Sequence, residues 1–375
     1  MHFRVWHTQQ QTIRFGDRVK AKIITCAVAT LVASSANAQS SVTLFGAIDA
    51  GLTWVSNSDG HSNTFMQGGI SNNTGFGISA IEDLGGGTRA IAKLLNTFDI
   101  GTGSLYSPGM MFRYSYVGLD NDSLGKLTMG LETDFMFNYM TIDRWGPMLA
   151  SLEPTFTQGG PYPGLGAPAF GSMDFLRTAD LYSTPNAVSY ESPRIAGFKF
   201  GAMYGFGGQA GAFSQNSTQS MGVSYNAGPF ALDAAYTYTK FPTINAGNSG
   251  LRDWGVGGRV PIGQGFAALM VAQATNTFNN ARVMVYDFAA TYPLSPAAIV
   301  GFEYQFNDGN HAVNDVKMHQ AGLNLAYYLS KRTSVYGFVA YQHASGGADA
   351  LIPGAGAFSS SGNQTMVRLG MMHTW

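Results

Sequence analysis

The stretch that decides the fold is Ala298-Ile299-Val300-Gly301-Phe302-Glu303-Tyr304-Gln305-Phe306-Asn307. From Val300 onward its apolar side chains alternate with glycine or polar ones, so the apolar set shares one face and Glu303, Gln305 and Asn307 share the other. This is the pattern of a β-strand with one apolar side. The same period of two returns at residues 220–225, 232–239 and 320–327, which predicts an all-β fold.

The alternating segments have the features of strands that face lipid. A soluble β-sandwich also alternates, but its strands are usually about 5 to 6 residues long. Here the segments run to about ten residues and often carry Tyr or Phe near their ends, where aromatic rings meet the headgroups of a bilayer. The chain has 48 glycines, and its mean hydropathy is +0.00. It has no run of about 18 apolar residues, which excludes helical spans and leaves a closed barrel.

The amino terminus has the composition of an export signal. Basic residues at 14, 18, 20 and 22 precede an apolar run over residues 23–32, and Ala36-Asn37-Ala38 has the pattern of a cleavage site. We therefore predict a signal peptide over residues 1–38 and a barrel domain over residues 39–375. The apolar run is too short for a membrane anchor, which needs about 20 residues. Cys26 is the only cysteine, so the mature chain forms no disulfide.

The mature chain is mildly acidic. The whole sequence has 21 basic and 22 acidic residues. Five of the basic residues and one of the acidic residues lie in the predicted signal. The mature chain then has 16 basic and 21 acidic residues, a net charge of −5. A nucleic-acid-binding domain is typically basic, so nucleic acid is excluded as a partner.

Turn residues divide the mature chain into sixteen predicted strands, joined alternately by seven short turns and eight longer loops. This alternation is expected of an antiparallel barrel with both termini in the periplasm, short periplasmic turns and long extracellular loops. The predicted fold is a 16-stranded antiparallel transmembrane β-barrel. Its strands are expected at residues 41–55, 74–83, 88–98, 111–119, 126–137, 186–191, 197–207, 217–226, 229–240, 251–260, 265–275, 283–292, 297–307, 317–328, 333–343 and 364–375.

One loop is far longer than the others. Residues 138–185 show no alternation and are rich in proline and glycine, and loops of such length are usually functional. A barrel of this size has a water-filled lumen, so we predict that this third extracellular loop folds inward and narrows it. The charged residues expected at the constriction, from this loop and the end of the preceding strand, are Asp134, Asp143, Arg144, Glu153, Asp174, Arg177 and Asp180.

Basic residues on the strands are predicted to line the opposite side of the pore. Arg89 and Lys93 are opposite in phase to the apolar residues of their strand, and Arg113 has the polar phase of the next strand. A charge on the lipid face costs about 2 to 4 kcal/mol at the bilayer midplane, which favours the inward orientation. Lys199 and Arg259 share this phase on later strands.

Several segments resemble the general diffusion porins of Gram-negative bacteria, particularly those of the β-proteobacterial branch. The resemblance rests on Glu82-Asp83-Leu84-Gly85-Gly86-Gly87, on residues 112–119 and 327–336, and on Tyr190-Glu191-Ser192-Pro193, together with the opening strand at 42–51 and the closing His373-Thr374-Trp375. It spans the mature chain and implies a homotrimeric, sixteen-stranded pore constricted by its third loop. It also implies contact with outer-membrane lipid and lipopolysaccharide, and assembly by periplasmic chaperones and the barrel-assembly machinery.

The chain departs from the family at positions that bear on selectivity. Three basic positions of relatives correspond here to Gly75, Ser79 and Leu131, so an anion preference cannot be carried over. We predict a weakly selective pore that favours cations, because ring charge sets ion preference. The terminal Trp375 replaces the usual Phe, and this aromatic end is expected to close the barrel against the first strand, because an open edge cannot persist in lipid.

Other classes of function are disfavoured by the residues present. An enzyme needs a nucleophile, a base and an orienting group together, and no serine lies in a nucleophile-elbow context. The histidines of the mature chain have no ligand-like spacing, so neither a metal nor a cofactor is expected. The predicted function is an outer-membrane channel for passive diffusion of small hydrophilic solutes and ions. A substrate-specific channel or a loop-mediated surface adhesin stays open as an alternative.

Overall fold

A computed structural model describes residues 40–105, 111–143, 157–162, 164–166, 173–179, 181–228 and 230–375. The predicted signal peptide, residues 1–38, lies outside these residues, so it stays a prediction. Among the described residues, no helix has the length and apolar composition needed to cross a membrane.

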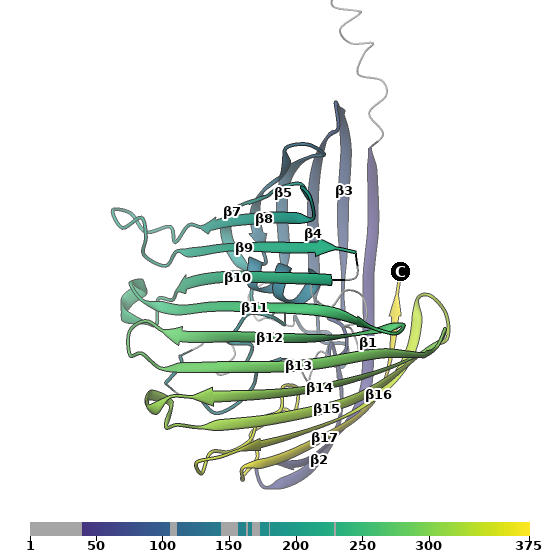
Figure 1. The fold of residues 1–375 in the computed structure, drawn as a ribbon, viewed down its shortest axis with the longest axis vertical. Helices are drawn as coiled ribbons and strands as arrows, with labels where there is room; N and C mark the ends of the chain where they lie inside the picture. The colour runs from purple at the N-terminus through teal and green to yellow at the C-terminus, as the bar shows by residue number, and fades with distance from the viewer. Residues whose placement is uncertain are drawn as a thin grey trace, which may run out of the picture.

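The strands form one closed antiparallel barrel in which each strand pairs with the next along the chain, except that β2 and β3 both pair with β1 (Figure 1). Closure comes from pairing of the last strand with the first, from Ala47 opposite Thr374 to Val55 opposite Met366. The strands are β1 (Ser41–Ser58), β2 (His61–Gly68), β3 (Gly75–Gly85), β4 (Thr88–Thr97), β5 (Tyr114–Asn121), β6 (Gly125–Glu132), β7 (Thr184–Glu191), β8 (Phe198–Gly205), β9 (Thr218–Ala227), β10 (Phe230–Lys240), β11 (Gly250–Ile262), β12 (Gly265–Asn276), β13 (Arg282–Ser295), β14 (Ala298–Gly309), β15 (Lys317–Tyr328), β16 (Thr333–Ala344) and β17 (Asn363–Thr374).

The barrel is sixteen-stranded although seventeen segments are numbered, because β2 and β3 share one edge of β1. The first half of β1 pairs with β3, and its second half pairs with β2. The predicted fold class and strand number are therefore confirmed. The segment His61–Gly68 was not predicted as a strand, because its polar sequence lacks alternation; it forms as a hairpin that extends β1 beyond its predicted end at residue 55.

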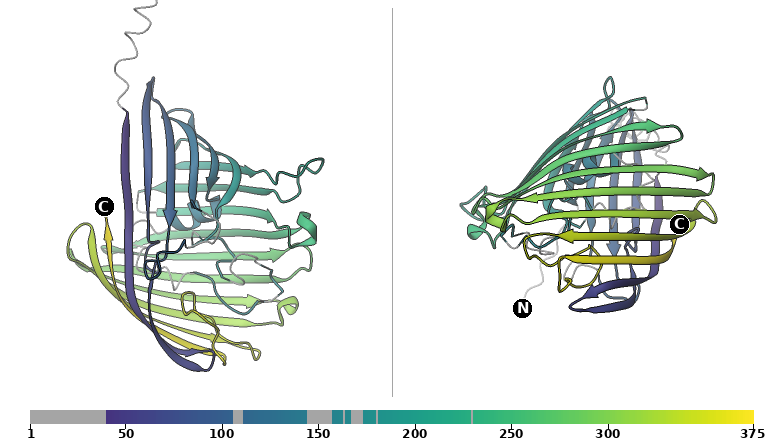
Figure 2. Two further views of the ribbon diagram at one scale, coloured as in Figure 1. Left: turned by 180° about the vertical axis from the view of Figure 1, so that it is seen from behind. Right: turned by 60° about the horizontal axis from the view of Figure 1, so that its bottom comes forward.

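Alternation along the strands separates the outer face from the inner face. On β14, Phe302 is 41% exposed and faces outward, whereas Glu303 and Gln305 are 1% and 0% exposed and face inward. Strands on opposite walls cross one another, as the tilted strands of a closed barrel do: β1, β3 and β4 run nearly at right angles to β10–β15 in Figure 1 and in the view from behind in Figure 2.

Seven short turns lie at the end of the barrel where β1 begins and β17 ends. The turn between β3 and β4 is made by Gly86 and Gly87, whose φ angles of 61° and 73° favour glycine. The longer connections lie at the other end. The third of these, residues 133–183 and called L3 below, contains the short helix α2 (Phe135–Phe137) and the π-helical segment η1 (Asn138–Asp143). The eighth, residues 345–362, is called L8.

Candidate functional site

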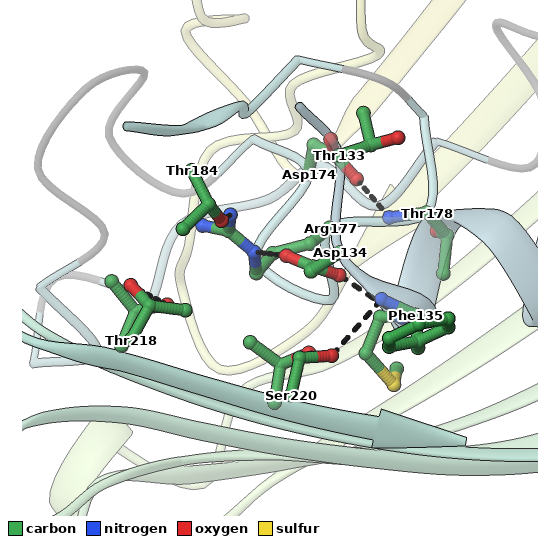
Figure 3. A network of polar contacts seen from close by, with 12 residues as sticks. Thr133, Asp134, Phe135, Asp174, Arg177, Thr178, Thr184, Thr218 and Ser220 are labelled. Atoms are coloured by element: carbon green, nitrogen blue, oxygen red, sulfur yellow. Dashed lines mark hydrogen bonds and ion pairs between the residues drawn. The ribbon is translucent and has the colours of Figure 1, made fainter. Parts of the chain in front are cut away.

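The start of L3 packs against glycines on the inner wall. Asp134 caps α2 by accepting a hydrogen bond from the backbone N–H of Met136 at 2.9 Å, and the N–H of Phe135 donates to Ser220 Oγ at 3.0 Å (Figure 3). A Cβ added to Gly201 would clash with the ring of Phe135. A Cβ added to Gly222 would lie 2.5 Å from the ring of Tyr139. Glycine at these two positions therefore lets L3 lie flat against β8 and β9.

An apolar cluster continues this contact across the barrel. Its members from L3 include Tyr162, Leu165, Phe175 and Leu176, all fully or almost fully buried. Its members from the wall are mostly small or flexible: Ala187, Met203, Ala235, Met270, Ala272, Ala274, Val283, Val285 and Met318. These wall residues extend from β7 to β15, so the described part of L3 lies inside the barrel along this side.

One buried ion pair ties the two ends of L3 together. The guanidinium Nε of Arg177 donates to the Asp134 carboxylate, and its NH2 donates to Thr184 Oγ1 at 3.3 Å (Figure 3). The Arg177 guanidinium also lies 5.1 Å from the ring centre of Tyr182. The ion-paired side chains are only 6% and 1% exposed, so the pair is shielded from salt.

Asp174 organises the turn that carries Arg177. Its carboxylate accepts hydrogen bonds from the backbone N–H groups of Thr178, Ala179 and Leu181, at 2.8, 3.0 and 3.2 Å. Burial nevertheless raises the pKa of Asp174 to about 7, because desolvation of the carboxylate outweighs these three hydrogen bonds and the nearby Arg177.

Four predicted residues of L3 fall where the structure gives no side-chain description. Arg144, Glu153 and Asp180 lie outside the described residues, and so does the side chain of Asp143, although its backbone ends η1. Of the predicted loop set, the structure brings Asp134, Asp174 and Arg177 together. The role of this whole set in a constriction stays a prediction.

The predicted wall residues lie at different heights. Arg89 lies beside the short turn between β3 and β4 and is paired with Asp120 at 2.9 Å and with Asp122 at 2.7 Å. On the same rim, Glu191 pairs with Lys199 at 2.7 Å and with Lys126 at 3.5 Å. These charges are balanced locally by their partners.

Lys93 and Arg113 lie farther from the turns. The Lys93 ammonium lies 5.4 Å from the ring centre of Phe45 and 4.7 Å from that of Tyr114, and Lys93 is directly opposite Ser79 on β3. Arg113 precedes β5 and is 5% exposed. Lys93 and its neighbours are half-buried, whereas the inward residues of β10–β15 are almost entirely buried.

Sequence reasoning missed four inward acids on the later strands. Asp233, Asp253, Asp287 and Glu303 lie on β10, β11, β13 and β14, and each is at most 2% exposed. Asp233 and Asp287 lie in one cross-strand row of the wall. Between them the row runs from Asp233 to Gly257, then to Met270, then to Asp287, each residue opposite the next on the neighbouring strand. The strand phase used to orient the basic residues applies equally to these acids and was the signal available.

The seam between β17 and β1 holds a second buried polar network. Arg368 Nε donates to Tyr336 Oη at 2.8 Å, and this hydroxyl donates to Asp49 Oδ1 at 2.6 Å. Beyond it, the backbone N–H of Trp375 donates to Gly46 O at 3.2 Å, and the indole occupies the space that a side chain at Gly46 would need. The terminal residue thus lies on the first strand, and its role in barrel closure stays a prediction.

Comparisons with known proteins agree with this architecture. The sequence model of the Gram-negative porin family matches residues 25–347. An outer membrane porin protein of Bordetella pertussis is 25% identical over 382 residues, covering 86% of this chain and 94% of the relative. Outer membrane porin protein 32 of Delftia acidovorans is 28% identical over 373 residues, covering 93% and 98%.

Solved structures share the fold. An anion-selective porin from Comamonas acidovorans superposes with a TM-score of 0.76 at 22% identity, covering 90% of this chain and 100% of that chain. OmpT, an outer membrane protein of Vibrio cholerae, superposes with a TM-score of 0.62 at 15% identity, covering 90% and 98%. The likeness extends over almost the whole barrel.

Proposed function

Because this chain belongs to the Gram-negative porin family and is an outer-membrane diffusion channel, we propose that small hydrophilic solutes and ions pass between L3 and the wall formed by β3, β4 and β5. The observation that carries the proposal is the asymmetry of the inner face. Inward residues of β10–β15 are buried, whereas Ser79, Lys93 and Tyr116 on the other wall are only half-buried. Water therefore reaches the wall opposite L3.

Liposome swelling tests this pathway. Purified protein in liposomes should admit sugars at rates that fall smoothly with size, because a diffusion pore sorts solutes by diameter. Lys93→Trp, which places a large side chain on the proposed passage, should slow every sugar, and Asp287→Asn on the covered wall serves as the control. A wild-type protein that sorts sugars by chemistry at equal size would favour a substrate-specific channel instead.

The ion preference is proposed to be weak and in favour of cations. The predicted mature charge of −5 supports this sign, while Lys93 on the passage opposes it. The family's basic positions, which are Gly75, Ser79 and Leu131 here, add no positive charge. Reversal potentials in a salt gradient should indicate a small cation preference, and Lys93→Gln should increase it. A strongly anion-selective wild-type channel would refute the proposal.

The assembly is proposed to be a homotrimer. One solved structure of OmpT from Vibrio cholerae is described as a trimer form. The outward residues Val42 and Leu44 of β1 are 73% and 60% exposed, which leaves apolar surface for a neighbour as well as for lipid. Native mass spectrometry in detergent should give three chains per particle, and a stable monomer would contradict this assignment.

Recognition by the assembly machinery is proposed to depend on Trp375. Its indole packs on β1, so its loss weakens the seam as well as the aromatic end of the chain. Deletion of Trp375 should lower the amount of folded barrel in the outer membrane, whereas Trp375→Phe should retain it. Undiminished levels of the truncated chain would argue against this role.

A further inference from the structure

The last and first strands of the barrel meet at a seam that no turn joins. β17 and β1 lie at opposite ends of the described chain, and their pairing closes the barrel with Gly51 opposite Gly370 and Thr53 opposite Arg368. In a hairpin, the turn fixes which residues face each other across the two strands. The register of this seam must therefore be set by contacts between the strands themselves.

The lipid-facing side chains of the seam do not set its register. The exposed outward residues of β17 are Val367, Leu369 and Met371, and those of β1 include Leu52 and Trp54. All of them are large and apolar. A slip of two residues, about 7 Å along the strand, again places apolar side chains opposite one another in lipid. The inner face of the seam therefore has to distinguish the observed register from the slipped ones.

On the inner face, a buried arginine of β17 binds groups of β1 and β2. Arg368 is 0% exposed. Its guanidinium donates from Nη1 to Gly51 O at 3.2 Å and to Thr53 Oγ1 at 2.9 Å, and from Nη2 to Gln67 O at 3.0 Å. Nη2 also lies 3.6 Å from Asp49 Oδ1. The five N–H donors of a guanidinium lie in one fixed plane, so these bonds form together only where Arg368 lies opposite Thr53.

Tyr336 on β16 bridges the two charged groups. Its hydroxyl accepts from Arg368 Nε at 2.8 Å and donates to Asp49 Oδ1 at 2.6 Å. The other carboxylate oxygen of Asp49, Oδ2, accepts from the backbone N–H groups of Ile70 and Ser71 at 2.8 and 2.7 Å. Asp49 therefore links the seam to the connection between β2 and β3.

The two opposed glycines of the seam make room for this network. A Cβ added to Gly370 would clash with the ring of Tyr336, and a Cβ added to Gly51 would lie 2.9 Å from Cζ of Arg368. A slip of two residues would separate the glycines and place Arg368 or Met372 opposite Gly51. The space that holds the ring and the guanidinium side by side therefore depends on the observed register.

We propose that Arg368, Tyr336 and Asp49 set the register of the β17–β1 seam. In a register slipped by two residues, the Arg368 guanidinium and the Asp49 carboxylate are displaced by about 7 Å relative to each other and stay buried without these partners, which is strongly unfavourable. The register at closure fixes the stagger of the strands, and with it their tilt and the diameter of the barrel. Residues buried in the seam thus control the width of the pore.

Cysteine cross-linking across the seam tests this proposal. The only cysteine of the sequence lies in the predicted signal, so introduced thiols have no competitor in the mature chain. Leu52 and Leu369 face each other on the outer side, so Leu52→Cys/Leu369→Cys reports the observed register. Leu52→Cys/Val367→Cys and Leu52→Cys/Met371→Cys report the two slipped registers.

The variant that removes the network is Arg368→Met/Asp49→Leu, which deletes both charges together and leaves neither buried alone. In the protein with an intact network, only the reporter of the observed register should cross-link. In the variant, at least one slipped reporter should cross-link as well, and the yield of the first reporter should fall. The matched control is Arg89→Met/Asp120→Leu, which deletes an ion pair between directly opposite residues of β4 and β5 and should leave the seam in the observed register.

Heat-modifiable gel migration restricts the comparison to folded barrels. If the double variant does not fold, Tyr336→Phe removes only the hydroxyl that joins Arg368 to Asp49, and it should give a smaller yield of slipped cross-links. Folded variants that cross-link only in the observed register would overturn the proposal and show that the network stabilises the seam without selecting its register. Equal cross-linking of all three reporters with the network intact would overturn it as well.

Discussion

The two loops inside this barrel are held by different chemistry. L3 lies on glycines and other small wall residues through aromatic and aliphatic side chains, and a single buried ion pair joins its ends in the part of the loop that the structure describes. The described contacts of the inward part of L8 combine a smaller apolar cluster with hydrogen bonds from glutamine side chains to its backbone. Extensive apolar packing and one buried ion pair therefore hold L3, whereas L8 combines less apolar packing with hydrogen bonds from neutral side chains.

The largest effect is expected from breaking the ion pair of L3. Arg177→Ala leaves Asp134 buried without its cation, and removal of one partner of a buried pair typically costs about 3–5 kcal/mol. The start of L3 should detach, giving noisier and larger single-channel currents. Arg177→Lys retains the charge and serves as the control. Quiet, wild-type currents from Arg177→Ala would show that the apolar contacts alone hold L3.

A smaller effect is expected from adding a side chain at Gly201, where the Phe135 ring of L3 packs against β8. In Gly201→Val the new side chain takes the place of the Phe135 ring, and overpacking of this kind costs about 1–3 kcal/mol. Conductance should rise because Phe135 has to move away from β8. The matched control is Ala202→Val, which adds the same side chain on the outward face of β8. Equal conductance in Gly201→Val and in this control would contradict the proposed seat.

A pH dependence should distinguish the two loops. The pKa of an aspartate is about 3.9 in an unfolded chain, and burial raises the pKa of Asp174 to about 7. The folded turn therefore binds more protons between these two values and becomes less stable as pH rises through them. Hydrogen exchange at the amides of Thr178 and Ala179 should therefore report easier opening at pH 7.5 than at pH 5, after correction for intrinsic exchange. Asp174→Asn should remove this difference.

Hydrogen exchange at the backbone of L8, measured in the same experiment, provides the comparison with L3. The described hydrogen bonds of L8 come from amide side chains, which do not titrate, so protection at Leu351 and Ile352 should not depend on pH in this range. A parallel loss of protection in both loops would indicate that they open as one unit.

Sequence alone predicted the barrel because lipid outside and a polar interior impose a period of two on every strand, as at residues 298–307. The sequence placed residues such as Arg89 and Lys93 on the inner face of the barrel, but it did not give their positions along the barrel axis. The ion pair between Arg89 and Asp120 at the rim was therefore not predicted. The seats of the loops were not predictable, because Gly222 and Gln342 look like ordinary strand residues until the distant segments that they contact are in place.

The most direct test of how L3 is held is a disulfide between the two loops where Gly159 of L3 lies beside Pro353 of L8. Because the only cysteine of the sequence lies in the predicted signal, Gly159→Cys/Pro353→Cys adds the only pair of thiols to the mature chain. In single-channel recordings of Arg177→Ala carrying this pair, oxidation should restore the quiet wild-type currents, and reduction should return the noisier, larger ones. Currents that do not respond to oxidation, with the disulfide verified by mass spectrometry, would contradict the claim that the Arg177–Asp134 pair holds L3 in place.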